Sequence, residues 1–486
     1  MSTTNPFYYP NPVLPDAFVG RQNILRDISK ALVEDPGASY AIIAGRRLGK
    51  TSILMSLAYK LNTMRLSASS HWRSLPIFFD FQSRSFDSPE SFYACILNEI
   101  RCRVDILAPD KPNDVWPMPI TLDSRIRTLC QSAKLTLPDF QLALKQILTQ
   151  LDKPGNRVRL VLLLDEVDRI IAQGLLDSLG DGLRSLTSSS DVNSRVRLVI
   201  SGSRKLFDVV TIGSPFLNIL RKCHLTTFDK SEIRDLSKKT DKFSENIISA
   251  VWQYSGGHPL IAQYLFHHLW ASGRKELSEK TIDKYALNFQ HEYLDDIEGW
   301  ARAAGESGLR VYRILSANDG WLSEADIAKQ IQDETININH ILLNLSCHGI
   351  IIHQDWQRYK YSGLVFKKWF DANGTAFINT ILREKSLIEG SIKETNESLE
   401  TPVQQNLVHK EQQSGWPIIL ISYTLSILFI TIAVALIISK IVSTEKFIPF
   451  FAALVFVILA LLVGVDKLTG DQFLKLVEKL ISKIMH

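Results

Sequence analysis

Apolar residues recur along the first half of the chain in short runs that lack polar alternation. The clearest run is Tyr40–Ile43, and similar runs lie at Leu75–Phe81, Val158–Leu164 and Arg197–Ile200. Such runs are typical of parallel strands covered on both faces, and the stretches between them are long enough for crossover helices. The pattern therefore predicts an α/β domain built on a parallel sheet.

Helical periodicity replaces the strand pattern after Ser231. The sequence Ser255-Gly256-Gly257-His258-Pro259 interrupts it, because glycine can end one helix and proline can begin the next. Residues 307–372 then show three helical patterns followed by two short segments, Gly349–Ile352 and Tyr359–Tyr361, around a polar turn. Three helices closed by a β-hairpin predict a winged helix.

Two apolar segments near the C-terminus, Trp416–Ser439 and Phe447–Val465, each approach the ~20 residues that cross a bilayer as a helix. Because only Lys440–Lys446 separates them, they predict a hairpin with both ends on one side of the membrane. The tail after it could lie on the membrane surface or pack against its own protein. The predicted domains are an α/β core at 1–229, a helical segment at 230–306, the winged helix at 307–372, a helix end and polar, flexible linker at 373–415, two transmembrane helices at 416–465 and an amphipathic tail at 466–486.

Composition and charge add limits. The 486 residues carry a net charge of +4, too small and too evenly spread to argue for nucleic acid binding. Five cysteines lack the paired spacings of a zinc site or a disulfide framework, so we expect reduced thiols. Met1–Gly20 resembles no signal peptide. We expect a protein of the inner (plasma) membrane with its soluble body and both termini in the cytoplasm.

The segment Ala44–Thr51 follows the first predicted strand and opens a helix. A glycine-rich loop in this context is typical of nucleotide binding, because backbone N–H groups at a helix N-terminus can surround a polyphosphate. Lys50 can reach the β and γ phosphates of ATP, and Thr51 can bind Mg²⁺. Ala44 replaces the first glycine of the usual pattern, so we expect an altered loop. The predicted nucleotide-binding residues here are Gly45, Arg46, Arg47, Leu48, Gly49, Lys50, Thr51 and Ser52.

A second apolar strand ends in two acids, Asp165 and Glu166. Asp165 would hold Mg²⁺ together with Thr51, and Glu166 would orient or deprotonate the attacking water. Ser201, at the end of the next strand, is placed to sense the γ phosphate or to form a plain turn. Arg204, Arg184 and Arg221 are candidate arginine fingers across an oligomer interface, and each could equally be a surface or ion-paired residue.

These motifs, in combination, resemble the STAND group of AAA-like ATPases, near the archaeal-type ATPases. The resemblance covers roughly residues 15–372. It rests on the motifs Phe18–Arg21, Arg46–Ser52, Leu164–Asp168, Ser201–Ser203, Ser214–Ile219 and Gly256–Pro259. It implies a P-loop NTPase sheet with a helical lid and a winged helix, which hold ADP in a closed state and oligomerise when ATP replaces it.

In that family the Gly-x-Pro turn of the lid approaches the nucleotide, which here points to Gly257, His258 and Pro259. His258 would sense phosphate charge, or it would pack between domains at a helix start. The long sensor repeats usual in STAND proteins are missing, so the protein or ligand that triggers the switch is unidentified.

Two functions fit these patterns. The first is a membrane-anchored ATP switch that oligomerises, with membrane lipid as a partner, and resembles effectors of bacterial conflict or phage defence. Its hairpin would be either an anchor or a pore-forming element. The second is a nucleic-acid-binding ATPase similar to origin-recognition initiators. Ile336–His348, the presumptive recognition helix, contains no Lys or Arg, which disfavours the second because phosphate neutralisation supplies most non-specific DNA affinity.

Overall fold

A computed structural model describes the backbone of most of the chain up to Glu400. The chain divides into two compact units, residues 1–395 and residues 396–486, and the first of these holds the elements that follow, apart from the end of the last helix. The described residues are 4–35, 37–63, 72–84, 86–106, 120–131, 135–152, 157–188, 195–212, 216–273, 278–331 and 336–400.

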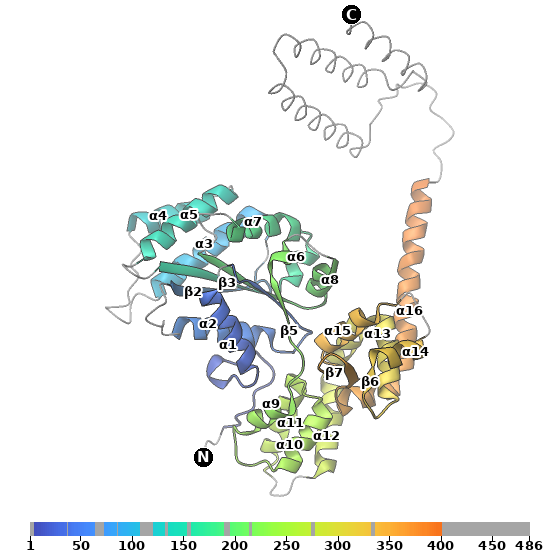
Figure 1. Ribbon diagram of the computed structural model, residues 1–486. Coiled ribbons are helices and arrows are strands. Elements are labelled where there is room, and N and C mark those ends of the chain that lie inside the picture. Colours follow the sequence, from blue (N-terminus) through green and yellow to red (C-terminus); the bar gives the residue numbers. More distant parts are fainter. Residues whose placement is uncertain are drawn as a thin grey trace, which may run out of the picture. The chain divides into compact units, whose positions relative to one another are not determined.

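A five-stranded parallel sheet forms the core, with strand order β2-β3-β4-β1-β5 (Figure 1). The four predicted strands are confirmed. The fifth was not predicted, because β5 is a polar edge strand with little apolar pattern. The strands are β1 (Tyr40–Ile43), β2 (Trp72–Asp80), β3 (Arg157–Asp165), β4 (Val196–Gly202) and β5 (Arg221–His224).

Helices cover both faces of this sheet, as the unbroken apolar runs require. On β3, Val161 and Leu163 pack towards α1 and α2, while Leu160, Leu162 and Leu164 pack towards the helices of the other face. The helices of the core are α1 (Gln22–Glu34), α2 (Lys50–Thr63), α3 (Pro89–Ile106), α4 (Ile120–Gln131), α5 (Leu137–Leu151), α6 (Asp168–Ala172), α7 (Leu176–Ser188) and α8 (Arg204–Ile212).

Four helices follow the sheet, and we call them the helical unit. The predicted break is confirmed: α10 ends at Ser255, Gly256 adopts the left-handed conformation with φ +58°, and α11 begins at Pro259. An added Cβ at Gly256 would lie 2.2 Å from the backbone of Ser362, so glycine is required there. The helices are α9 (Lys230–Ser237), α10 (Glu245–Ser255), α11 (Pro259–Ala271) and α12 (Glu279–Glu292).

Three helices and a small antiparallel sheet come next, and we call them the hairpin unit. The expected helices and hairpin are present, with two differences: the first helix begins earlier and is interrupted at Gly305 (φ +70°), and a short third strand joins the hairpin. The unit shares one hydrophobic core with the helical unit. Its elements are α13 (Leu294–Ser316), β6 (Leu322–Ser323), α14 (Glu324–Ile331), α15 (Ile338–Cys347), β7 (Ile351–Gln354) and β8 (Arg358–Tyr361).

The last described helix corrects the predicted linker. α16 runs from Leu364 to Glu400, so residues 386–400 are helical rather than a flexible coil. This stretch is rich in strong helix formers and has no proline before Pro402, which explains the extension. Residues 401–415, both predicted transmembrane segments and the amphipathic tail lie outside the described residues. Within the described part of the chain, no helix combines the length and apolar character needed to cross a membrane.

The N-terminal leader crosses from the helical unit to the first strand–helix connection. Phe7 is 1% exposed and stacks on Phe266 of α11, with ring centroids 5.2 Å apart. Further along, the Val13 amide donates to Ser52 Oγ at 3.0 Å. The leader was expected to belong to the core domain, but residues around Phe7 pack on the helical unit. Local sequence does not reveal this, because the contact joins residues more than 250 positions apart.

Candidate functional site

The loop Ala44–Gly49 connects β1 to α2 at the carboxyl edge of the sheet. Positive φ angles occur at Arg47 (+65°) and Gly49 (+84°), not at Ala44. Ala44 instead continues the sheet, and its amide donates to the Gly202 carbonyl at 3.1 Å. The expectation that alanine would alter the loop is therefore wrong, because this position needs no left-handed backbone.

Gly45 is required for a different reason. Its amide donates to the Cys347 carbonyl at 2.6 Å, at the end of α15. A Cβ added at Gly45 would lie 2.6 Å from His348 Nδ1 and 2.9 Å from His348 Cα. The turn Cys347–Gly349 of the hairpin unit is thus seated directly on the β1–α2 loop. We call this the turn contact.

Lys50, the first residue of α2, is buried between the loop and the end of β3. Its Nζ donates to the Gly45 carbonyl at 3.2 Å and lies 3.7 Å from Glu166 Oε1. Burial raises the pKa of Glu166, and the nearby carboxylates of Asp165, Asp168 and Asp80 raise it further, against the lowering effect of Lys50. A carboxylate with a raised pKa beside a phosphate-binding lysine is suited to accept a proton from water.

The Asp165 carboxylate is the centre of the site. It is 1% exposed, and its Oδ2 accepts from Thr51 Oγ at 2.6 Å. Its Oδ1 accepts from Ser201 Oγ and from the Glu166 amide, the latter at 3.1 Å. Thr51 lies in α2, Asp165 ends β3 and Ser201 lies in β4, so the structure brings these predicted site residues together. Ser201 here orients Asp165.

Asp168 and Arg204 lie beside this centre. The Asp168 carboxylate accepts hydrogen bonds from the Ser203 amide and from the Leu206 amide, the latter at 3.1 Å. It therefore caps the N-terminus of α8, which begins at Arg204. Arg204 Nη1 in turn donates to the Arg302 carbonyl of α13 at 2.7 Å. The cap therefore fixes the direction in which Arg204 reaches the hairpin unit.

The other two candidate arginines lie elsewhere. Arg184 is exposed on α7. Arg221 begins β5, at the edge of the sheet opposite Lys50, and its Nη1 lies 2.8 Å from Asp35 Oδ2. Neither contributes to the site within one chain.

His258 and Pro259 were both predicted to approach the nucleotide, but only Pro259 lines the pocket. Pro259 lines the pocket above the loop, whereas His258 is buried against Trp300, with ring centroids 4.4 Å apart. Neither ring nitrogen of His258 has a hydrogen-bond partner among the described residues. Burial, with the positive charge of Arg21, lowers the pKa of His258 to about 3. This neutral histidine packs where the helical and hairpin units meet.

Arg21 has a structural role that motif spacing did not assign. It is buried, with φ +52°, and its guanidinium donates to the carbonyls of Leu48 and Thr226, the latter at 2.7 Å. Its burial lowers the pKa to about 10. Arg21 thereby connects the β1–α2 loop to the segment leaving β5. The motif Phe18–Arg21 signalled that the residue mattered, but not which groups it binds.

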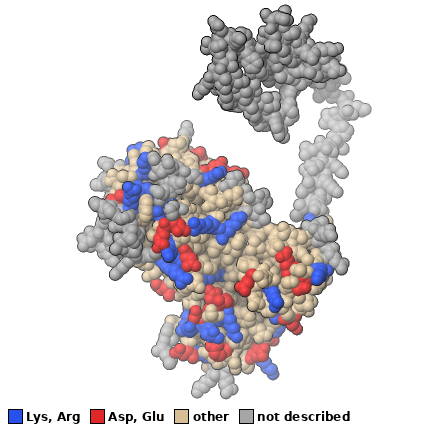
Figure 2. All heavy atoms as spheres, viewed as in Figure 1, with Lys and Arg blue, Asp and Glu red and all other residues tan. Residues whose placement is uncertain are grey.

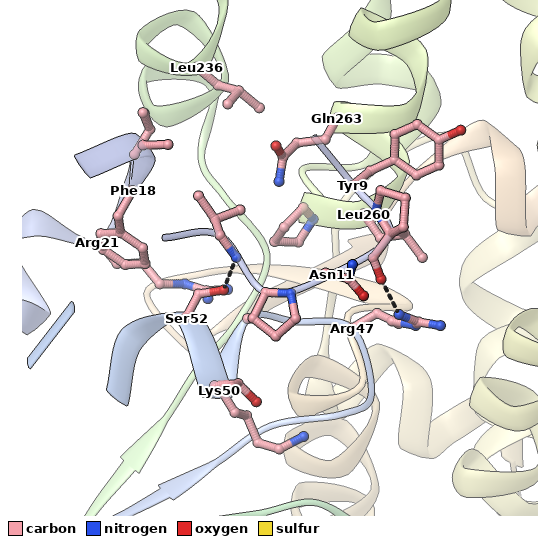
Figure 3. A pocket seen from close by; sticks show the side chains of 18 of the residues that line it. Tyr9, Asn11, Phe18, Arg21, Arg47, Lys50, Ser52, Leu236, Leu260 and Gln263 are labelled. Atoms are coloured by element: carbon pink, nitrogen blue, oxygen red, sulfur yellow. Dashed lines mark hydrogen bonds between the residues drawn. The ribbon is translucent and has the colours of Figure 1, made fainter. Parts of the chain in front are cut away.

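A pocket of about 390 Å³ lies above the loop and continues between the leader and the helical unit (Figure 3). Arg47 Nη1 donates to the Pro10 carbonyl at 3.0 Å, and its Nε lies 3.6 Å from Asp296 Oδ1 of α13. The leader thus forms one wall of the pocket. The predicted residues that line it are Arg46, Arg47, Gly49, Lys50, Thr51, Ser52, Glu166 and Pro259, whereas Gly45 and Leu48 support the loop from behind.

Comparison with known proteins agrees with this geometry. Residues 11–293, more than half of the chain, match the family model described as an AAA-like domain. The chain belongs to this AAA-like family. It is therefore a nucleotide-binding ATPase with the α/β fold of the P-loop NTPases. No curated protein matches the chain.

Several solved structures have a similar chain path. A Walker-type ATPase of Pyrococcus abyssi is 16% identical with a TM-score of 0.48, covering 75% of this chain and 99% of its own. The ORC2 protein of Aeropyrum pernix, solved as ADPNP-ADP complexes, is 13% identical with a TM-score of 0.43, covering 78% and 97%. The CDC6P protein of Pyrobaculum aerophilum is 17% identical with a TM-score of 0.36, covering 78% and 96%.

Replacing Lys50 and Glu166 should separate nucleotide binding from hydrolysis. Lys50→Ala should abolish ATP binding in a calorimetric titration, because the buried ammonium is lost from the loop. Glu166→Gln should keep ATP bound and slow hydrolysis by roughly 10² to 10⁴, the usual contribution of a general base. The exposed Lys30→Ala in α1 is the matched control and should behave as wild type. Equal ATP affinity for Lys50→Ala and wild type would contradict the assignment.

The turn contact should weaken as the pH falls below about 6.5, the ordinary histidine pKa. Burial, with the positive charges of Arg204 and Lys50, lowers the pKa of His348 to about 3. Above pH ~6.5 the imidazole is neutral whether the turn is seated or lifted, so the contact keeps its full strength. Below that pH only the lifted form binds a proton, which favours opening by ~1.4 kcal/mol per pH unit.

Hydrogen exchange of the Gly45 amide, corrected for its intrinsic rate, at about pH 7.5 and about pH 5.5 measures this opening. His348→Gln should reduce the pH dependence, and the remainder should come from His258 and from His224, whose Nδ1 lies 3.3 Å from Cys347 Sγ. The exposed His291→Gln should retain it in full. An unchanged pH dependence in His348→Gln would show that the turn contact does not titrate through this residue.

Proposed function

We propose that this ATPase is a nucleotide-controlled switch of the STAND type, in which the helical unit acts as a lid and the hairpin unit is a winged helix. The turn contact carries the proposal: the Gly45 amide binds the Cys347 carbonyl, so a module more than 300 positions away in sequence is seated on the loop that holds phosphate. A conformational change in that loop would therefore reach the hairpin unit directly.

The charges around the loop support a switch. Lys50 lies near Glu166, and Arg47 lies near Asp296 of α13 and binds the leader. The phosphates of ATP would compete with these carboxylates for the same two cations. ADP and ATP differ by one phosphate, so they would differ in how strongly they compete. A ligand shifts a conformational equilibrium only through such a difference in affinity.

The oxygen ligands fit Mg²⁺. Thr51 Oγ and Asp165 Oδ2 lie 2.6 Å apart at the loop, and hydroxyl and carboxylate oxygens are the ligands that Mg²⁺ prefers. These two residues would hold the ion, which would neutralise phosphate charge when bound. Glu166 would orient or deprotonate the water, and Ser201 would keep Asp165 in position.

We further propose that ATP binding drives homo-oligomerisation through the hairpin unit. Arg204 now donates to the Arg302 carbonyl, and Phe207 of α8 packs on His340 of α15 with ring centroids 4.9 Å apart. Lifting the hairpin unit would expose this side of α8. Arg204 would then be available as an arginine finger for a neighbouring subunit.

Nucleic acid binding, the alternative, has less support. The helix α15 contains no Lys or Arg and packs against α8 and the β1–α2 loop. On the face drawn in Figure 2, basic and acidic side chains of the described residues are interspersed. A protein that bound DNA through its phosphates would be expected to present a continuous basic surface.

The proposed output is the membrane. Residues 416–465 would anchor the protein as a helical hairpin in the plasma membrane, with the soluble body in the cytoplasm. ATP-driven assembly would cluster the hairpins and make the membrane leak, as in an effector of bacterial conflict or phage defence. Support comes from the sequence, because the two apolar segments contain no Asp, Glu, Lys, Arg or His. They therefore lack the ionisable residues that line the pathway of a selective transporter.

Gly45→Ala should release the switch. Its Cβ would lie 2.9 Å from the His348 backbone, so the turn must move. We expect faster release of a fluorescent ADP analogue and oligomers at lower ATP concentration, measured by stopped flow and analytical ultracentrifugation. Gly349→Ala, which crowds Leu48 from the hairpin side, should act likewise without changing the loop sequence. Gly299→Ala in α13, where a Cβ meets nothing, is the control. If both Gly45→Ala and Gly349→Ala release the ADP analogue and form oligomers as wild type does, the switch proposal is wrong.

The membrane output is tested in cells with a potential-sensitive dye. Glu166→Gln should trap the assembled form and depolarise the membrane. The double variant with Lys50→Ala should not, because it binds no ATP, and neither should a chain without residues 416–465. If Glu166→Gln oligomerises in membranes but leaves the potential and cell growth unchanged, the hairpin is an anchor and the effector proposal is wrong.

A further inference from the structure

The part of the pocket away from Lys50 is formed by the leader and the helical unit. Gln263 follows Pro259 by four positions and Leu260 by three on α11, so it shares a helix face with each of them, and all three line the pocket. Leu236 lies across from Gln263, and Lys50 lies at the far end of the pocket (Figure 3). The walls here are largely apolar, as the faces of a planar base require.

The leader and the helical unit contribute four polar side chains to this pocket, and they differ in what they can recognise. Asn11 already donates from Nδ2 to the Tyr8 hydroxyl at 2.8 Å. Tyr9 packs edge-on against Tyr264 and directs its hydroxyl away from the pocket (Figure 3). The polar lining residues from these two segments are Tyr9, Asn11, Lys239 and Gln263.

Gln263 is distinguished by an unused acceptor. Its side chain is directed into the pocket (Figure 3), the residue is 8% exposed, and its Oε1 is buried without a hydrogen-bond partner among the described residues. A buried acceptor without a partner costs about 1 to 3 kcal/mol. A ligand that brings a donor to this position would remove that cost.

We propose that Gln263 selects adenine, by accepting a hydrogen bond from the exocyclic N6 amine with Oε1 and donating from Nε2 to N7. A carboxamide matches this donor and acceptor pair, whereas the same edge of guanine offers two acceptors, O6 and N7. Guanine would leave Oε1 unpaired. Lys239 can only donate, so it would bind a ring nitrogen of either purine without discriminating between them.

The inference rests on the proposed binding of ATP between the loop and the helical unit. The inference assigns recognition of the base to Gln263. The phosphate-binding loop cannot distinguish one base from another, because every nucleoside triphosphate has the same phosphates. Gln263 would contact the nucleotide directly, from an element that also carries Pro259. Base recognition would thus draw α11 towards the leader.

The test measures dissociation constants of the full-length chain for ATP, GTP and 7-deaza-ATP, by displacement of a fluorescent ATP analogue. Wild type should prefer ATP to GTP by about tenfold and to 7-deaza-ATP by about three- to tenfold, the value of one neutral hydrogen bond. Gln263→Leu should weaken ATP and bind ATP and 7-deaza-ATP equally, because the partner of N7 is gone. Gln253→Leu, on the exposed face of α10, is the matched control and should keep the wild-type ratios.

Three results would overturn the proposal. Wild type could bind ATP and GTP equally. Gln263→Leu could retain the wild-type preference for ATP over 7-deaza-ATP. It could also weaken all three nucleotides by the same factor, which would mean a structural role for Gln263. A wild-type chain that binds none of the three would instead refute the proposed nucleotide site itself, so the two failures are distinguishable.

Discussion

A single close approach of two backbones sets the relation between the modules of this protein. The Gly45 amide binds the Cys347 carbonyl, and only the absence of a side chain at Gly45 allows His348 to lie against the loop. Gly349 of the same turn approaches Leu48 and His258. The β1–α2 loop therefore cannot change its backbone conformation at Gly45 without moving the turn of the hairpin unit that contacts it. In the proposed switch, this contact would transmit a change at the phosphate to the hairpin unit.

The catalytic edge of the sheet is organised around one buried carboxylate. Asp165 accepts hydrogen bonds from Thr51, Ser201 and the Glu166 amide, so its two oxygens join α2 and β4 to the end of β3. Parallel strands make this arrangement possible because their carboxyl ends lie along one edge. Burial, together with the acids there, raises the pKa of Glu166, whose Oε1 lies 3.7 Å from Lys50 Nζ. The proposed catalytic residue Glu166 and the phosphate-binding Lys50 thus belong to one charged cluster.

The nucleotide pocket is completed by parts that lie far apart in the chain. The leader is fixed on the helical unit through Phe7 and reaches the loop through Val13, while α11 supplies the facing wall. Arg21 joins the loop to the segment that leads into the helical unit. The wall near Lys50 comes from the β1–α2 loop and the end of β3, whereas the opposite wall comes from the leader and the helical unit.

The sequence alone determined the strands β1 to β4, the loop before Lys50, the acids at Asp165 and Glu166, and the break between α10 and α11. Each of these depends on neighbouring residues: apolar runs, glycine and proline positions, or charge at the end of a strand. Only the tertiary structure decided why Gly45 must be glycine, where the leader lies, and that His258 faces Trp300 while Gln263 faces the pocket. It also supplied β5, whose pairing with β1 compensates for its polar sequence. These features depend on contacts between residues distant in sequence. A local sequence pattern does not predict which surfaces the folded chain brings together.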